Sequence, residues 1–342
     1  MEIGLKYTSH ALRSEETMSE IQHLTSHIPE LMAGRRLDQA LAELFPSYSR
    51  ARLQAWIRDG QVKVDAQPWR AHDKVRGGEY IEIAAIPRQE VAWQPEPLAL
   101  EVVYEDATLL VINKPAGLVV HPGAGNSAGT LLNALLHHAP ELAEVPRAGI
   151  VHRLDKDTSG LLVVARTLQA QISLVRQLQA RSLHREYDAV AAGVMTSGGQ
   201  VDMAMARHPV QRTRMAVAKT HAEHAKPAVT HYRVVTRFRA HTHIKARLET
   251  GRTHQIRVHM AHIHYPIVGD PVYGGRLRLP AGASERLIAS LHGFKRQALH
   301  ASALGLTHPE SGADMQWSAP LPADMLELID VLKEDARDFA RH

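Results

Sequence analysis

The sequence predicts an α+β fold in which a mixed, largely antiparallel central sheet follows a smaller α/β domain. Three observations lead to this prediction. The 342 residues exceed the usual length of one domain. Residues 85–98 contain three prolines and no apolar periodicity, which is typical of an extended linker. Beyond residue 99, strand-like segments with turn signals dominate and do not alternate regularly with helices, which disfavours a Rossmann or (β/α)₈ plan.

The composition excludes several classes of protein. With no cysteine, the chain cannot use disulfides, iron–sulfur clusters, cysteine-ligated zinc or thiol catalysis. No window approaches the roughly 20 apolar residues that cross a bilayer, and the start lacks the plan of a signal peptide. We therefore expect a cytoplasmic protein without a membrane partner. The 40 Lys and Arg residues allow local basic surfaces that attract polyanions.

The charge distribution changes near residue 34, and we place a domain boundary there. Residues 1–33 hold two basic and five acidic side chains, whereas residues 34–76 hold nine basic and five acidic ones. The first segment also lacks sustained periodicity, so residues 1–33 are predicted to be a flexible leader.

Residues 34–84 have the pattern of a small domain with two helices and a hairpin. Leu37, Ala40, Leu41 and Leu44 have helical spacing, and Pro46 ends that helix. Ser49 can cap a second helix, whose apolar face carries Leu53, Trp56 and Ile57. Short strands are expected at residues 62–64 and 80–83, with the turn-forming pair Gly77-Gly78 between them.

Basic side chains gather on the second helix and the strand after it. Arg50, Arg52 and Arg58 lie on the helix, and Lys63 lies on the strand. Clustered cations of this kind bind phosphates, although an ordinary solvated helix face is an equal alternative. Together with Arg36-Leu37-Asp38 and Asp59-Gly60-Gln61-Val62-Lys63-Val64, the order of elements over residues 34–84 resembles the S4 RNA-binding domain.

The larger domain, predicted over residues 99–330 with a tail at 331–342, contains a polar turn between two apolar segments. The turn is His152-Arg153-Leu154-Asp155-Lys156-Asp157-Thr158-Ser159-Gly160. Residues 161–165 are apolar on both faces and therefore predict a central strand. A rigid strand that holds a loop carboxylate suits catalysis, so Asp155 is a candidate acid. The alternative is that Asp155 caps the turn, as we expect of Asp157 and Ser159.

Two later residues are candidates for the same site. Tyr187 precedes a strand-like segment at 189–192 and could stack on a base and exchange a proton, although structural burial is the commoner role. Thr253 can cap a helix whose buried stripe is Ile256, Met260 and Ile263, which leaves Arg257 and His259 off that stripe. Arg257 could keep a catalytic carboxylate ionised, or could be a surface arginine.

Other segments suggest RNA contacts or no special chemistry. Lys295 and Arg296 precede a late strand and could either bind RNA or form plain surface. The chain has no glycine-rich nucleotide loop, so neither ATP nor NAD is expected as a cofactor. Among the 23 histidines, the spacing of His259, His262 and His264 does not match a helical zinc pair, and no metal is expected.

Six ordered motifs resemble the pseudouridine synthases that modify large-subunit ribosomal RNA. They are Asn113-Lys114-Pro115, His121-Pro122-Gly123, the Asp155 motif, Arg185-Glu186-Tyr187, the Arg257 motif and Gly269-Asp270-Pro271-Val272-Tyr273-Gly274-Gly275.

The resemblance implies a pseudouridine synthase catalytic domain with Asp155 as the catalytic aspartate. It implies that Tyr187 stacks on the target base, that Arg257 pairs with Asp155, and that Arg153 and His152 help to hold the extruded nucleotide. It further implies a cofactor-free reaction on 23S rRNA, at the helix 69 stem-loop, in the large ribosomal subunit or its precursor.

Two other functions fit parts of the pattern. A glycoside hydrolase uses two carboxylates, and Asp157 could be the second, but hydrolysis would not explain an RNA-binding module at the front of the chain. A non-catalytic rRNA-binding protein has no need for Asp155, Tyr187 and Arg257 together. Whether Asp155 attacks the sugar or removes a sugar proton stays open, because both routes require the same ionised carboxylate.

Overall fold

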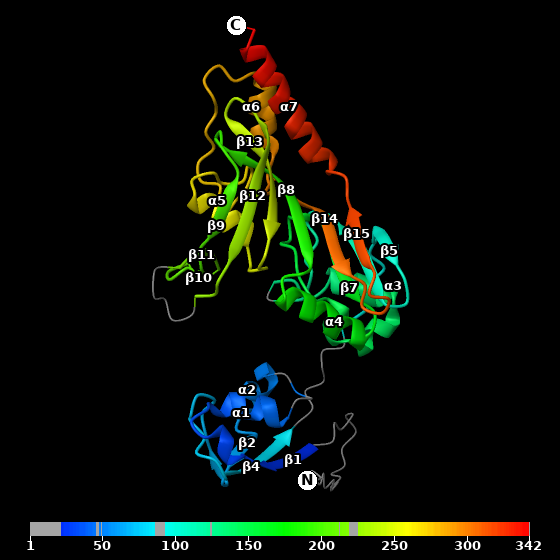
Figure 1. Cartoon of the computed structure of the whole chain (residues 1–342), viewed down its shortest axis with the longest axis vertical. Helices are drawn as coiled ribbons and strands as arrows, with labels where there is room; N and C mark the ends of the chain where they lie inside the picture. Colours follow the sequence, from blue (N-terminus) through cyan, green and yellow to red (C-terminus); the bar gives the residue numbers. More distant parts are fainter. Residues whose placement is uncertain are drawn as a thin grey trace. The chain divides into compact units, whose positions relative to one another are not determined.

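The chain divides into two compact units, residues 1–92 and 93–342 (Figure 1). The computed structural model describes residues 22–45, 48, 50–85, 93–123, 125–211, 213–218 and 225–341. Each unit has a hydrophobic core of its own. None of the helices in these described ranges is long and apolar enough to span a membrane.

The first unit contains the two helices and the small sheet that the sequence predicted. Its elements are β1 (Gln22–His27), η1 (Glu30–Met32), α1 (Leu37–Leu44), α2 (Arg50–Arg58), β2 (Val62–Val64), β3 (Gln67–Pro68) and β4 (Tyr80–Ala85). The strand order is β1-β4-β2-β3, with antiparallel pairing throughout. Leu37, Leu41 and Leu53 from the helices pack with Val64 and Ile81 from the sheet. Ser49, the predicted cap of α2, lies outside the described residues.

The predicted leader differs from the structure over residues 22–33. β1 pairs with β4 along its whole length, from Gln22–Ala85 to His27–Tyr80, and η1 follows it. Ile28 and Met32 are buried in the core of the first unit. The apolar residues here are too few to give a clear period, and an edge strand needs only one buried face. Residues 1–21 lie outside the described part of the chain.

The second unit has the predicted α+β architecture around one large sheet. Its elements are β5 (Val102–Glu105), β6 (Leu109–Lys114), α3 (Leu131–His138), η2 (Pro140–Glu144), η3 (Pro146–Gly149), β7 (Ser159–Ala165), α4 (Leu168–Gln179), β8 (His184–Ala192), β9 (Gly199–Asp202), β10 (Met205–Arg207), β11 (Met215–Val217), β12 (Val229–Arg237), β13 (His241–Leu248), α5 (Gln255–His262), α6 (Glu285–Gly293), β14 (Leu299–Thr307), β15 (Asp314–Ser318) and α7 (Ala323–Phe339).

The sheet order is β5-β6-β7-β14-β8-β13-β12-β9, with β15 beside β14. Within the described residues, the β7–β14 pair is parallel and the other strand pairs are antiparallel. The prediction of a mixed, largely antiparallel sheet is therefore confirmed. Figure 1 shows β8, β12 and β13 side by side, with α5 next to them.

β7 is the central strand that its double-sided apolar pattern predicted. Leu162 and Val164 face one core together with α3 and the β8–β13 region. Leu161 and Val163 face a second core, which is covered by Ala170 and Leu174 of α4. Covering both faces excludes water and makes β7 a rigid support for the loop that precedes it.

Residues 93–98 of the predicted linker and the predicted tail belong to the second unit, whereas residues 86–92 of the linker lie outside the described residues. In the predicted linker, Glu96 accepts a hydrogen bond from the Gly129 backbone N–H, and the Asn133 side chain donates to Gln94 O. In the predicted tail, α7 continues to Phe339 and buries Val331 and Leu332. The amphipathic period of α7 extends past residue 330, so the sequence already contained this signal.

Candidate active site

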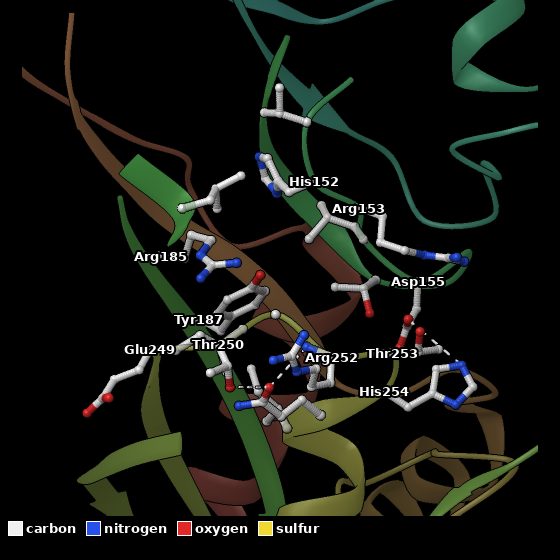
Figure 2. A pocket seen from close by; sticks show the side chains of 18 of the residues that line it. His152, Arg153, Asp155, Arg185, Tyr187, Glu249, Thr250, Arg252, Thr253 and His254 are labelled. Carbon is white, nitrogen blue, oxygen red and sulfur yellow. Dashed lines mark hydrogen bonds and ion pairs between the residues drawn. The ribbon is translucent and has the colours of Figure 1, made fainter. Parts of the chain in front are cut away.

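A cavity of about 620 Å³ lies where the loop before β7 meets β8 and the segment that leads into α5 (Figure 2). Asp155, Tyr187 and Arg257 all line it, and so do His152 and Arg153. Pockets of roughly 300–1,000 Å³ hold small molecules in proteins. The fold thus gathers into one cavity five residues that the sequence places as far as 105 positions apart.

Asp155 stands on a loop that is fixed from several sides. The Thr158 backbone N–H donates to Asp155 O at 3.1 Å and closes the turn. Lys114, which is 1% exposed, donates from Nζ to Lys156 O at 3.0 Å and also to the carbonyls of Pro115 and Leu118. Burial lowers the pKa of Lys114 to about 7, although the Asp157 and Asp155 carboxylates oppose that shift.

Arg257 connects Asp155 to a second, deeper carboxylate. Arg257 Nη1 donates to Asp155 Oδ2 at 3.0 Å, while Nε and Nη2 donate to Asp270 at 2.7 and 2.9 Å. The Asp155 side chain is 15% exposed and that of Asp270 is fully buried. Burial opposes the charge of Arg257, but the two carboxylates outweigh it and raise the pKa of the guanidinium above its ordinary value. Arg257 therefore holds the Asp155 carboxylate in place and is itself held in place by Asp270.

The position of Arg257 differs from the expectation for its helix. Residues 255–260 of α5 are all buried, Arg257 and His259 among them, so the helix has no solvated face at this point. His254, in a left-handed conformation with φ 58°, precedes the helix in place of the predicted Thr253 cap. The reason is tertiary, because Asp270 and Asp155 offer a buried arginine the partners that a helical pattern cannot reveal.

His254 and Tyr273 complete the surroundings of Asp155. His254 Nε2 lies 3.8 Å from Asp155 Oδ1, and His254 Nδ1 lies 2.8 Å from the Tyr273 hydroxyl. Burial lowers the pKa of His254, against the opposing charge of Asp155. The Arg257 guanidinium also lies 5.1 Å from the centre of the Tyr273 ring. Among the described residues, the Asp155 carboxylate thus accepts a hydrogen bond from Arg257, lies close to the His254 ring and lines the cavity.

Tyr187, on β8, points into the cavity and is 5% exposed. Burial raises the pKa of its hydroxyl, and the nearby Arg185 opposes this shift. Figure 2 shows the Arg185 side chain beside Tyr187, with Asp155 farther away from both.

His152 and Arg153 lie at different depths in the cavity. The His152 ring accepts a hydrogen bond at Nε2 from the Val163 backbone N–H at 3.2 Å, which ties the loop to β7. Arg153 is exposed and has no hydrogen bond or ion pair among the described residues. Arg153 is therefore free to meet a ligand that enters from outside.

Lys295 and Arg296 do not line the cavity. Lys295 is exposed, but Arg296 forms a paired contact with Asp324 at 2.6 and 2.8 Å and donates to Asp157 O at 3.2 Å. These bonds give Arg296 a supporting position behind the Asp155 loop, in contrast with the RNA contact considered from the sequence.

In the first unit, three of the four basic residues considered for RNA binding lie in different environments. Arg50 donates to the buried Asp38 at 2.7 and 3.1 Å. Arg52 packs over the rings of Tyr48 and Trp56. Lys63 is exposed on the solvent side of β2. Arg50 thus contributes to the fold of the unit, and Lys63 is accessible to a phosphate.

The other chemistries considered from the sequence would use further carboxylates or histidines, and several of these groups bond to other protein groups among the described residues. The carboxylates that line the cavity there are Asp155 and Glu249, and Glu249 is engaged by Arg181 and His231. Asp157 does not line the cavity. His259 bonds through both ring nitrogens, to Thr230 Oγ1 and Met203 O.

Sequence reasoning missed the supporting residues. Asp270, Lys114 and Arg185 occur in the motifs that carried the resemblance, but no role was assigned to them from the residues themselves. The sequence did contain one signal for a buried supporting residue, because Lys114 is a charged residue that closely follows the apolar run Leu109–Ile112.

Comparison with known proteins agrees with this architecture. The family model described as RNA pseudouridylate synthase matches residues 108–262, and the S4 domain model matches residues 35–81. The chain belongs to the RNA pseudouridine synthase family. It is 57% identical over 323 residues to ribosomal large subunit pseudouridine synthase D from Yersinia pestis, covering 94% of this chain and 98% of that protein.

The same named protein from Pseudomonas aeruginosa is 55% identical over 322 residues, covering 94% of this chain and 99% of that protein. Among solved structures, human RNA pseudouridylate synthase domain containing 4 aligns with a TM-score of 0.55 and 25% identity, over 68% of this chain and 93% of that one.

Proposed function

We propose that this protein converts uridine to pseudouridine in 23S rRNA, at the helix 69 stem-loop, on the large ribosomal subunit or its precursor in the cytoplasm. The observation that carries the proposal is the loop carboxylate Asp155, bonded to the buried Arg257–Asp270 pair and facing a cavity beside Tyr187. The names of the relatives at 57% and 55% identity support the choice of RNA.

The reaction needs few groups, and the cavity offers them. The C1′–N1 bond of uridine breaks, the base turns, a C1′–C5 bond forms, the proton on C5 leaves and N1 takes up a proton. The atoms are conserved and no electrons are exchanged with an outside reagent, so one well-placed carboxylate can suffice. Asp155 either attacks C1′ or removes a sugar proton, and Arg257 balances its charge on either route.

The base must leave the RNA stack to reach Asp155. Flipping costs a few kcal/mol, and stacking on an aromatic ring together with arginine contacts offsets it. Tyr187 supplies the ring inside the cavity, and the exposed Arg153 supplies a cation at its mouth.

Asp155→Asn tests the proposal, because it keeps the shape of the side chain and removes the charge. We expect pseudouridine formation to be abolished, while RNA affinity and the melting temperature stay close to those of the wild type. Tritium release from [5-³H]uridine-labelled rRNA measures turnover, since C5 loses its hydrogen when it joins the ribose. Wild-type turnover by the variant would refute the role of Asp155.

Chemical mapping of pseudouridine in rRNA tests which part of the rRNA is the target. Cells with and without the protein are compared, and the expected difference is confined to the helix 69 loop. If the pseudouridines that disappear without the protein lie elsewhere in 23S rRNA, the proposed activity stands but the helix 69 target is refuted. An unchanged map together with retained rRNA binding would favour the non-catalytic alternative.

A further inference from the structure

The inner end of the cavity holds an arginine without a partner. Arg185, on β8, is 6% exposed and lines the cavity. Its Nε is buried without a hydrogen-bond acceptor, and among the described residues the whole guanidinium forms no hydrogen bond or ion pair. Buried charges in proteins are normally paired, because desolvating an unpaired one is costly. Arg185 therefore needs a functional explanation.

A second unpartnered donor lies nearby on His152. Its Nε2 accepts the Val163 backbone N–H, so in the neutral ring the proton is on Nδ1. That Nδ1 is also buried and has no partner. Burial and the positive charge of Arg185 lower the pKa of His152 to about 3, which keeps the ring neutral at physiological pH. Arg185 and His152 thus present two donors without an acceptor.

The surrounding backbone makes room for this arrangement. A Cβ placed on Gly251 would lie 2.6 Å from Arg185 Nη1. Gly251 does not have a positive φ, so the closeness of the guanidinium, and not the backbone conformation, is what a side chain would meet here. The segment that leads into α5 therefore passes directly against the guanidinium.

The depth of the two donors indicates which part of an RNA they meet. When a nucleotide flips into a pocket, its base enters while the phosphates stay with the chain outside. Arg147 and Arg153 are exposed and line the same cavity, so they are placed for phosphates. In Figure 2, Arg185 lies beside Tyr187, and both lie well apart from Asp155, which the proposed function places at the sugar. A base lying along the Tyr187 ring would direct its edge away from the sugar and toward Arg185.

We propose that Arg185 and His152 bind the carbonyl edge of the flipped uracil. This inference rests on the proposed function. When the C1′–N1 bond breaks, the electron pair stays on the uracil and is shared by N1 and the two carbonyl oxygens. Donors fixed at those oxygens stabilise this charge, and they keep doing so until C5 bonds to C1′ and the C5 proton leaves.

Arg185→Met and His152→Gln test the inference. Methionine fills the space without charge or donor, and glutamine can still accept from Val163 N–H while it offers no donor at the Nδ1 position. For Arg185→Met we expect the single-turnover rate on rRNA to fall by roughly 10²–10³-fold, as for loss of one charge-stabilising donor. RNA affinity and its salt dependence should stay unchanged, and the melting temperature should stay equal or rise.

Modified RNA identifies the contact directly. The target uridine is replaced by 2-thiouridine or 4-thiouridine, because sulfur accepts hydrogen bonds more weakly than oxygen. The wild type should slow on at least one of these RNAs, and Arg185→Met should lose that sensitivity. Arg181→Met is the matched control, since Arg181 also lines the cavity but pairs with Glu249. This control should keep the sensitivity of the wild type.

Each outcome decides one question. A wild-type rate for Arg185→Met, or unchanged thio sensitivity, overturns the base contact. Weaker RNA binding with a smaller salt slope assigns Arg185 to a phosphate instead. A clearly lower melting temperature assigns it to the fold. If the wild-type protein forms no pseudouridine in the same assay, the proposed function fails, independently of Arg185.

Discussion

Arg257 shows how one side chain can serve both the fold and the site. Two nitrogens of its guanidinium donate hydrogen bonds to Asp270, and the third donates to Asp155. A lysine could not make this planar set of bonds, because its ammonium is a point charge without a fork. The partly exposed carboxylate is thereby positioned by a contact that solvent barely reaches.

Asp270 should make the stability of the protein depend on pH. Burial alone would raise its pKa, but bonds from Arg257 and the Tyr273 and Val272 N–H groups hold it below its ordinary value of 3.8. A depressed pKa stabilises the fold above pH 3.8, and this contribution is lost as the pH falls below that value. We expect the wild-type unfolding free energy to drop below about pH 4.

Asp270→Asn isolates this contribution. It leaves Arg257 with less compensating charge and should lower the unfolding free energy at pH 7 by about 3–5 kcal/mol. Its stability should also fall less steeply below pH 4 than that of the wild type. Urea unfolding between pH 3 and 7, followed by circular dichroism, measures both effects. The exposed Asp338→Asn is the control, and equal slopes for all three proteins would contradict the prediction.

At the scale of elements, the site depends on the junction of β7 with β14. These two strands pair in parallel through Ser159–His300 and Ala301–Gly160, directly after the Asp155 loop. Gly160 has φ 113°, and a Cβ there would lie 2.2 Å from Ala301 O. The close contact of the two backbones fixes where the loop ends and hence where Asp155 is presented.

Gly160→Ala should therefore disturb both stability and activity. We expect a loss of at least about 2 kcal/mol of unfolding free energy, from the backbone clash and the unfavourable φ together. Gly312→Ala is the matched control, because Gly312 also has a positive φ but open space around it. It should cost only about 1 kcal/mol. Equal melting temperatures for the two variants would show that the close backbone contact between β7 and β14 does not limit the stability of the protein.

At the scale of the whole molecule, the segment that matches the S4 domain and the candidate active site lie on separate units. Among the described residues, those that line the cavity all belong to the second unit, and so do those of the cores around its large sheet. The first unit has its own core and exposes Lys63 on β2. We expect the second unit to fold alone and the first to add electrostatic affinity.

A fragment of residues 93–342 tests this division. It should unfold cooperatively and keep a single-turnover rate within a few-fold of the full chain at saturating rRNA. Its affinity should be weaker and less dependent on salt, since each lost phosphate contact reduces the slope by about 0.7–0.9. Filter binding at several salt concentrations gives the slopes, and Lys63→Gln in the full chain should reduce the slope by about 1. Identical slopes for fragment and full chain would refute the role of the first unit.

Much of this molecule follows from local pattern. The two apolar faces of residues 161–165 predicted the central strand β7, and the helical spacing of Leu37, Ala40, Leu41 and Leu44 predicted α1. The turn before β7 predicted an exposed acid at Asp155. Burial periodicity and turn chemistry act over a few residues, so a sequence states them directly.

Only the tertiary structure decided which charges would be buried and with what partners. Arg257 was expected off the buried stripe of its helix, Arg50 and Arg296 were considered as RNA contacts, and residues 22–33 were expected to lie in a flexible leader. The pairing of each of these residues or segments depends on a partner elsewhere in the sequence: Asp270 for Arg257, Asp38 for Arg50, Asp324 for Arg296 and β4 for residues 22–27. A polar residue looks the same in a sequence whether solvent or a distant partner satisfies it, and the desolvation energy that separates the two cases exists only in the folded chain.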